Sequence, residues 1–267
     1  MKLVFSEAQS DYSNYIFPYA IWAFPEAKET PAVFFANGFL PASRNLDRYY
    51  LCRQIRINLP HFQPSSENRR IFRKGEDIEF KLIPAEQFEY TPQWQQFCLH
   101  YADIKFGKNV MTEERLNSLF NSKIISHFLI FTDRQTGKDV GIVTLYLQKP
   151  HIAYYYYAFY DLNYYERNLG MFMMTSAVDY FAKQSFAFIY LGTCYSRNAL
   201  YKTQFSGAEF FNGFRWSDDL KELKYLIKRD KGTVKQHLAE TEEFRNLFYE
   251  NLTNLVHKSR FSMHPTA

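Results

Sequence analysis

The middle of the chain carries short apolar runs that are typical of strands. Residues 152–160 (IAYYYYAFY) are apolar or aromatic at every position, as in a strand buried at the centre of a sheet. Residues 127–132 and 139–147 flank a polar turn and predict a hairpin. Residues 186–191 (FAFIYL) predict a fourth strand, and the imperfect alternation over residues 49–59 predicts another.

Between and after these runs, apolar residues recur every three or four positions, which predicts helices. Ser65 or Ser66 stands where it can cap a short helix that Gly75 ends. Prolines punctuate the first 41 residues and exclude a long helix there. The predicted helices cover residues 67–74, 92–104, 112–120, 166–184, 197–205, 220–228 and 234–257.

These elements predict an α/β (α+β) fold, with a mixed, mostly antiparallel sheet and flanking helices. A smaller N-terminal subdomain and a C-terminal helical tail complete it. The length of 267 residues allows one large domain or two small ones, with a sizeable core. Hydrophobic residues at 46% and charged residues at 22% exclude general disorder. Aromatic residues reach 19%, and core packing is their default meaning.

Several classes of protein are excluded by the sequence. No run of about 18 apolar residues occurs, so we expect no membrane span and no membrane partner. The N-terminus turns acidic and polar too early for a signal peptide. Cys52, Cys98 and Cys194 are too widely spaced for a zinc ribbon, a Cys-x-x-Cys pair or a four-cysteine cluster within one chain. The seven histidines lack metal-ligand spacing, so no metal is expected, and a reducing cytoplasmic compartment fits best.

Positive charge is concentrated in one stretch of the chain. The net charge is only +4, but residues 44–74 hold eight basic and two acidic residues, a local excess of +6. Such a density predicts a surface that contacts a phosphate backbone. The alternative is a solvated face, which is the commoner fate of a charge run.

The turn after the apolar run at residues 152–160 carries the first motif. It reads Arg167-Asn168-Leu169-Gly170-Met171-Phe172 and opens a predicted helix. The order hairpin, buried strand, turn, helix, strand resembles the acyl-CoA N-acyltransferase (GNAT) core. There, a loop of pattern Gln/Arg-x-x-Gly-x-Gly/Ala holds a pyrophosphate at a helix N-terminus. Arg167 and Gly170 match, whereas Phe172 replaces a small residue. Gly170 could instead serve close packing of the helix on the sheet.

A longer, ordered series of motifs runs through the chain. Its residues are Gly38-Phe39, Tyr49–Arg53, Phe62–Ser65, Asn68–Lys74, Phe159-Tyr160-Asp161, Arg167–Met171, Tyr190-Leu191-Gly192, Tyr201–Phe205, Glu209 and Trp216. The series resembles the arginyl-tRNA–protein transferase family, the aminoacyl-tRNA–protein transferases, over about residues 10–217. The chain departs from that family at three places. Of the family's N-terminal cysteines only Cys52 remains, Lys105-Phe106 replaces an Arg-His pair, and the stretch between Gly192 and Tyr201 is shorter than the family's.

The resemblance implies a domain division and a reaction. Residues 1–80 would form an aromatic and basic subdomain, residues 81–217 a GNAT-like catalytic core, and residues 218–267 a helical extension. The enzyme would move an amino acid, arginine or leucine, from aminoacyl-tRNA to the N-terminal amine of an acceptor protein or peptide, without a cofactor. Two alternatives remain: a CoA-dependent N-acetyltransferase that uses acetyl-CoA, and a non-catalytic RNA-binding homologue.

Roles for individual residues follow from the same resemblance. Tyr201 would be the general acid that protonates the departing ribose oxygen, unless it only packs in the core. Lys202 and Arg167 would meet a phosphate or the carboxylate of an acidic acceptor. Asp161 would orient an amine, or it serves the turn. Glu209 would pair with Lys202 or Arg215. The remaining implied positions are Asn168, Leu169, Gly170 and Met171 for the donor phosphate; Arg69, Arg70, Arg73 and Lys74 for tRNA; and Tyr156, Tyr160, Tyr190 and Glu209 for the pocket.

Overall fold

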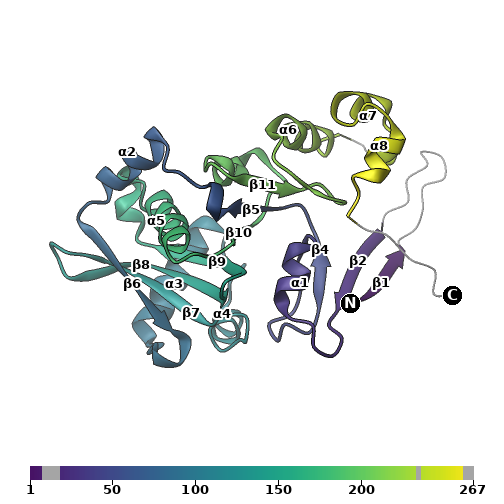
Figure 1. Cartoon of the computed structure of the whole chain (residues 1–267). Helices are drawn as coiled ribbons and strands as arrows, with labels where there is room; N and C mark the ends of the chain where they lie inside the picture. The colour runs from purple at the N-terminus through teal and green to yellow at the C-terminus, as the bar shows by residue number, and fades with distance from the viewer. Residues whose placement is uncertain (8–18, 233–235, 261–267) are drawn as a thin grey trace.

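A twisted eight-stranded sheet forms the centre of the molecule, as the computed structural model of the chain shows (Figure 1). The structure describes residues 1–7, 19–232 and 236–260. Neighbouring strands are antiparallel except for β9 and β10, which run parallel. In order across the sheet, the strands are β12 (Trp216–Ser217), β11 (Ala208–Phe211), β5 (Gln54–Asn58), β10 (Phe188–Thr193), β9 (Ile152–Tyr160), β8 (Lys138–Gln148), β7 (His127–Asp133) and β6 (Ile78–Pro84).

A second, four-stranded antiparallel sheet is built from the N-terminal part of the chain and lies beside the first (Figure 1). The short helix α1 (Pro31–Ala36) belongs to the same region and buries Phe34 and Phe35. Strand β5 follows β4 after two residues but lies in the large sheet, so the two sheets are joined by a very short connection. The small sheet has the order β1 (Lys2–Glu7), β2 (Tyr19–Phe24), β4 (Tyr49–Leu51) and β3 (Phe39–Pro41).

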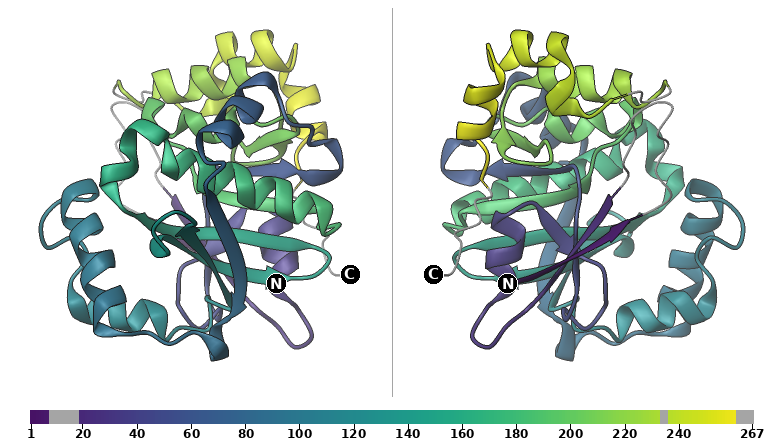
Figure 2. Two further views of the ribbon diagram at one scale, coloured as in Figure 1. Left: turned by 90° about the vertical axis from the view of Figure 1, so that its left-hand side faces the viewer. Right: turned by 90° about the vertical axis from the view of Figure 1, so that its right-hand side faces the viewer.

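Helices cover both faces of the large sheet (Figure 2). One hydrophobic core packs β-strand side chains against α2, α5 and the C-terminal helices, and the other packs the opposite face against α1, α3, α4 and the small sheet. The α-helices are α1, α2 (Ser66–Lys74), α3 (Pro92–Lys105), α4 (Glu113–Phe120), α5 (Leu169–Lys183), α6 (Leu220–Arg229), α7 (Glu242–Phe248) and α8 (Leu252–His257). The 3₁₀ helices are η1 (Leu59–His61), η2 (Ala85–Gln87), η3 (Leu162–Arg167), η4 (Arg197–Thr203) and η5 (Leu238–Glu240).

The predicted fold class is confirmed: the sheet is mixed, mostly antiparallel, and flanked by helices. The predicted hairpin is β7–β8, and the all-apolar run is β9, a strand in the interior of the sheet. Ser65 caps α2 by accepting from Asn68 N, and Thr112 caps α4 by accepting from Arg115 N. Within the described residues, every helix is too short or too polar to span a lipid bilayer.

Several predicted elements are wrong in their extent. Residues 49–59 form two strands in two different sheets, because β5 is buried on both faces and pairs with β10 and β11. The helix predicted for residues 234–257 is η5, α7 and α8 in the described part, since the chain turns at Tyr249 and Glu250. Residues 234 and 235 lie outside the described residues. Strands β6, β11 and β12, and β1, β2 and β3 of the small sheet, lie outside the predicted strands. Strand β6 (IEFKLIP) alternates over seven residues, whereas β11 and β12 span only four and two residues and give little local pattern.

The domain division stays a prediction. The proposed boundary at residue 80 falls within β6, and β5, from the N-terminal segment, lies between β10 and β11 of the large sheet.

Candidate functional site

A cavity opens where β9 and β10 diverge. The two strands are paired only from Phe188 opposite Ile152 to Tyr190 opposite Tyr154. Beyond that point β10 makes a bulge against β5 between Tyr190 and Gly192. The cavity has a volume of about 680 Å³. Its walls are Tyr101, Phe106, Tyr155, Tyr156, Tyr157, Ala158, Tyr160, Tyr165, Asn168, Leu169, Gly170, Met171, Met174, Leu191, Thr193, Tyr201 and Lys202.

A bulge in β9 places two consecutive tyrosines on one face of the sheet. Thr144 of β8 lies opposite Tyr157, and Leu145 lies opposite Tyr155, so Tyr156 is the extra residue. The extra residue shifts the alternation, and Tyr156 and Tyr157 pack together with ring centroids 4.6 Å apart. Both rings line the cavity. The bulge therefore turns a regular strand into an aromatic wall.

The N-terminus of α5 faces the cavity. Asn168 adopts the left-handed conformation (φ 55°, ψ 41°), and no side chain caps the helix. The first turn of α5 carries no acidic residue. Leu169 and Gly170 supply the first helical amides, which lack acceptors within the helix and favour an anion. A 15-residue helix that begins in this way offers a binding position for a phosphate.

Gly170 also serves the close packing that the sequence left as an alternative. A Cβ atom at this position would lie 2.8 Å from Cε1 and Cζ of Tyr160 and 2.9 Å from its hydroxyl. The glycine therefore lets the Tyr160 ring rest against the first turn of α5. Phe172 does not obstruct the cavity, because it points into the core, where its ring fills the space beside Gly75.

Lys202 is the one cation among the cavity walls, all of which lie in the described residues. Its Nζ donates to the carbonyl of Thr193 at 3.0 Å. Burial lowers the pKa of this ammonium, while nearby Cys194 acts in the opposite direction. The cavity walls include no carboxylate. Lys202 therefore remains available to an anionic group or to a proton transfer.

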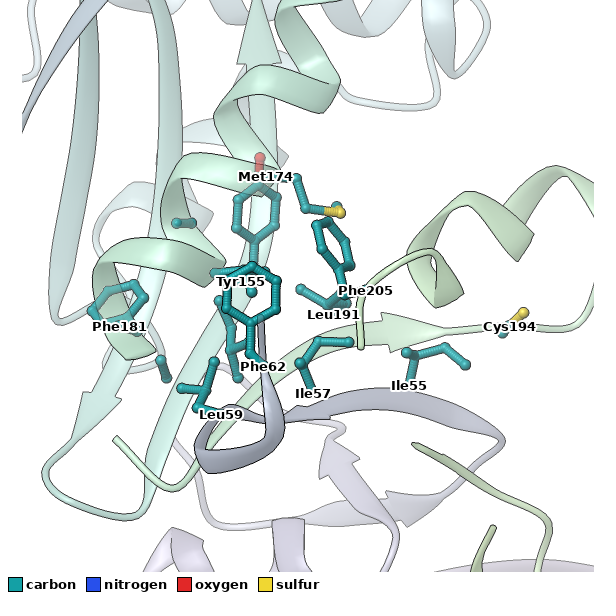
Figure 3. Close-up of a cluster of buried hydrophobic side chains, with 14 of the residues drawn as sticks. Ile55, Ile57, Leu59, Phe62, Tyr155, Met174, Phe181, Leu191, Cys194 and Phe205 are labelled. Carbon is teal, nitrogen blue, oxygen red and sulfur yellow. The ribbon is translucent and has the colours of Figure 1, made fainter. Parts of the chain in front are cut away.

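Four tyrosines of the cavity walls, Tyr101, Tyr155, Tyr160 and Tyr201, lie close enough to influence one another's pKa. Tyr155 is only 5% exposed, and its hydroxyl has no hydrogen-bond partner among the described residues. Figure 3 shows its ring rising from β9 with the oxygen on the side of Met174 in α5. Tyr201 lies at the rim, 45% exposed. The pKa of Tyr201 is raised by partial burial of its ring and by the neighbouring Tyr160. Burial likewise raises the pKa of Tyr101, with a contribution from the Tyr160 hydroxyl.

Most of the predicted pocket and donor positions are brought together here. Eight of the predicted site residues, the catalytic candidates Tyr201 and Lys202 included, line the cavity: Tyr156, Tyr160, Asn168, Leu169, Gly170, Met171, Tyr201 and Lys202. The sequence did not point to Tyr101 or Tyr155 as pocket residues, although Tyr156 and Tyr160 of the same aromatic run were predicted to line the pocket. Nor did it point to Leu191 and Thr193, whose position depends on the divergence of β10 from β9.

Arg167 and Asp161 lie away from the cavity. The Arg167 guanidinium lies 3.3 Å from Asp77 and 3.8 Å from Asp133, because the left-handed Asn168 reverses the chain just after it. Arg167 thus joins the hairpin turn to the loop that precedes α5. Asp161 accepts from Asn163 N at 2.9 Å as the cap of η3, so the structure favours the turn role over amine orientation.

Tyr190 and Glu209 also lie outside the cavity, contrary to the prediction. Tyr190 is 1% exposed on the opposite face of β10 from Leu191, as strand alternation requires. The Glu209 carboxylate accepts from Arg56 Nε at 2.6 Å rather than from Lys202 or Arg215. Arg56 is sandwiched between the rings of Phe188 and Trp216, each 3.9 Å from its guanidinium carbon.

The basic stretch does not form one surface. Arg48 lies over the Trp22 ring, Arg53 pairs with Asp230 at 2.7 Å, and Arg56 is buried. These three guanidinium groups hold the fold together. Arg44 lines a separate hollow. The expectation of a continuous phosphate-contacting surface over residues 44–74 is therefore wrong, because its cations point to different parts of the molecule.

The four residues predicted to bind tRNA remain together on α2. Arg69 and Arg73 are exposed. Arg70 pairs with Glu67 one turn before it, at 2.5 Å. Lys74 donates to the carbonyl of Glu166 at 3.1 Å, which ties the end of α2 to the segment before α5. Helix α2, with its basic side chains, is thus held next to the segment that precedes α5 and the cavity.

Cys52, Cys98 and Cys194 are all buried and unpaired by disulfides. Burial raises the pKa of the Cys194 thiol, with Lys202 and Arg53 acting against it. No group of histidine, cysteine and acidic residues in the described part of the chain is arranged to hold a metal ion.

Comparison with known proteins gives distant similarities. No protein-family model matches the chain. An aspartate/glutamate leucyltransferase of Marinobacter nauticus is 24% identical over 176 residues, 62% of this chain and 70% of that protein. One of the same name from Stenotrophomonas maltophilia is 22% identical over 184 residues, 64% of this chain and 71% of that protein. The relatives are named for leucine, so the arginyl specificity of the resembled family is not supported by them.

Two solved structures show a weak similarity to the chain. L-PGS from Bacillus licheniformis has a TM-score of 0.44 and 11% identity. The match covers 67% of this chain and 64% of that chain, which is less than two thirds of its length. FemX has a TM-score of 0.38 and 8% identity, covering 53% of this chain and 52% of that chain. In sequence, the chain is similar over almost two thirds of its length to proteins named aspartate/glutamate leucyltransferases.

Proposed function

We propose that this protein is an aminoacyltransferase that moves leucine from leucyl-tRNA to the N-terminal amine of an acceptor protein whose first residue is acidic. One observation carries the proposal. A cavity of about 680 Å³, walled by tyrosines and holding one lysine, opens beside the uncapped N-terminus of α5. This arrangement offers an apolar space for an acyl group and a position for a phosphate. The distant similarity to leucyltransferases supports the same reading.

Leucine is favoured over arginine by the charge of the cavity. Its walls contain Lys202 and no carboxylate. An arginine side chain would bury its guanidinium without a counter-ion and next to another cation, which is strongly unfavourable. A leucine side chain would contact apolar groups such as Met174 and Leu191 and the tyrosine rings.

The donor would enter with its terminal phosphate at the amides of Leu169 and Gly170. The exposed guanidinium groups of Arg69 and Arg73 on α2 would contact the phosphate backbone of the tRNA. Such contacts add affinity that falls with salt and carry no base specificity. Arg70 and Lys74 contribute less freely, because Glu67 and the Glu166 carbonyl already engage them.

The reaction is aminolysis of an ester. The neutral α-amine of the acceptor attacks the carbonyl carbon, a C–N bond forms, and the bond to the ribose oxygen breaks. The amine loses one proton and the ribose oxygen gains one, so no net proton is consumed. Tyr201 at the rim would donate to the departing oxygen, and Lys202, whose lowered pKa favours the neutral amine, would receive the proton from the attacking amine. Passage of that proton to Tyr201 through water would restore both side chains. Positioning of an already activated ester supplies on the order of 7 kcal/mol or more.

The test uses the purified full chain with labelled leucyl-tRNA and arginyl-tRNA and with peptides that begin with Asp, Glu or Lys. Transfer of leucine to the acidic peptides, lost in Lys202→Ala and retained in Lys183→Ala, supports the proposal. Lys183 is the matched control, because its side chain is 71% exposed at the far end of α5. Transfer of arginine instead of leucine would refute the donor assignment.

Two other results would replace the proposal. Acetyl-CoA binding measured by calorimetry, without any transfer from tRNA, would assign the cavity to CoA-dependent N-acetylation. Binding of tRNA without either activity would make the protein a non-catalytic RNA-binding homologue. Cytoplasmic location stays a prediction.

A further inference from the structure

A second hollow adjoins the aromatic wall of the cavity. It has a volume of about 220 Å³ and is bounded by the loop after β3 and by α4. Tyr156 and Tyr157 line both the hollow and the cavity, so the two spaces meet at this tyrosine pair. The lining residues are Pro41, Ala42, Ser43, Arg44, Met111, Arg115, Leu119, Tyr156 and Tyr157.

Two guanidinium groups give the hollow its charge. Arg44 comes from the loop after β3, and Arg115 comes from the first turn of α4. Both lie close enough to the Tyr156 ring to act against the burial that raises the pKa of its hydroxyl to about 12. The fold thus brings Arg44 and Arg115, which are far apart in the sequence, to the lining of the same hollow.

No carboxylate in the lining neutralises this charge. Within the described chain, the Arg44 guanidinium has no hydrogen bond or ion pair. Arg115 uses one nitrogen, Nη1, to donate to the Val110 carbonyl at 2.9 Å. Ser43 donates its hydroxyl to Asp47, so that carboxylate is already engaged. The remaining N–H groups of the two arginines are therefore available to an anion.

The size and the walls of the hollow favour a short aliphatic carboxylate. Met111, Leu119 and the two tyrosine rings can contact a methylene group. Two guanidinium groups match the geometry of a carboxylate, which accepts paired N–H donors. A volume of about 220 Å³ is small beside the cavity of about 680 Å³, so it suits one side chain rather than a nucleotide.

We propose that Arg44 and Arg115 bind the side-chain carboxylate of the acidic N-terminal residue of the acceptor. The α-amine of that residue would reach past the Tyr156–Tyr157 pair into the cavity, where the donor ester lies. This inference rests on the proposed function for the identity of the acceptor, but its binding step can be measured separately.

The binding experiment uses calorimetry on the full chain without tRNA. Peptide amides that begin with Asp, Glu or Asn are titrated into the wild type, Arg44→Gln, Arg115→Gln and the double variant. Lys183→Gln serves as a control that removes an equal charge from a distant surface. We expect the double variant to bind the Asp peptide on the order of 10- to 100-fold more weakly, as loss of charge-assisted hydrogen bonds implies. Binding of the Asn peptide should be unchanged.

Different outcomes separate this inference from the proposed function. Binding of the Asp peptide that is lost when Arg44 and Arg115 are replaced supports the carboxylate site, even when the wild type transfers nothing from tRNA. Equal affinity of the wild type for Asp and Asn peptides overturns it, even in an active transferase. Weakened tRNA binding in the double variant, with unaltered peptide binding, would also overturn it and assign the hollow to a phosphate. Arg44→Lys and Arg115→Lys keep the charge, and unaltered thermal unfolding of each variant shows that it is folded.

Discussion

Gly170→Ala separates the two roles that one glycine can have at the start of α5. The added methyl carbon would lie 2.8 Å from two carbons of the Tyr160 ring, whereas ordinary contact begins at 3.4 Å. The ring must therefore retreat by about 0.6 Å, and the open cavity gives it room to do so. Overpacking costs about 1–3 kcal/mol in a closed core. Here the ring can move, and alanine favours the helix by up to about 1 kcal/mol.

We therefore expect Gly170→Ala to change the free energy of unfolding by less than about 1 kcal/mol, as urea denaturation would show. The displaced ring narrows the donor site, so kcat/KM for leucyl transfer should fall on the order of tenfold. In a Tyr160→Ala background the methyl group meets no ring, and Gly170→Ala should then change kcat/KM less than about twofold. A tenfold loss that persists in this background would show that the ligand itself, rather than Tyr160, requires the glycine.

Three further predictions concern single side chains. Arg56→Met should lower the free energy of unfolding by about 2–4 kcal/mol in urea denaturation. The substitution leaves the Glu209 carboxylate, whose side chain is only 21% exposed, without the guanidinium group that pairs with it. A smaller effect would show that the ion pair adds little to stability. Lys202→Met should raise the free energy of unfolding near neutral pH. Burial lowers the pKa of Lys202 in the folded protein, so the unfolded chain binds more protons at this residue. The gain in stability should shrink as the pH rises toward 10.5, the ordinary pKa of lysine, and a gain that stays constant from pH 7 to pH 10 would contradict this explanation. Tyr155→Phe should leave thermal unfolding unchanged or slightly higher, because the buried hydroxyl has no protein partner, while it weakens donor binding; a clear loss of stability would instead indicate a hidden hydrogen bond.

Local patterns in the sequence were sufficient for much of the fold. The apolar run of β9, the turn between β7 and β8, and the caps at Ser65 and Thr112 all act through neighbours a few residues away. The order of elements around the loop before α5 located the cavity for the same reason. A strand, a turn and a helix that follow one another in the chain keep the loop between them at one place.

Pairings between distant residues could be decided only by the tertiary structure. Arg56 and Glu209 are 153 positions apart and meet because β5 and β11 are neighbours in the sheet. No local pattern distinguishes Arg56 from Arg69, yet one is buried and the other is exposed. Asn168 adopts the left-handed conformation, and the chain changes direction there, so that Gly170 lines the cavity whereas Arg167, just before it, does not.

The sequence by itself therefore determined which segments form the core and where the loop before α5 begins. Only the tertiary structure decided which charges face a ligand, because the direction of a side chain depends on strand order, on bulges and on backbone conformation. The bulge at Tyr156 is the clearest case: one extra residue sets Tyr156 and Tyr157 on the same face, where the cavity and the hollow of Arg44 and Arg115 meet.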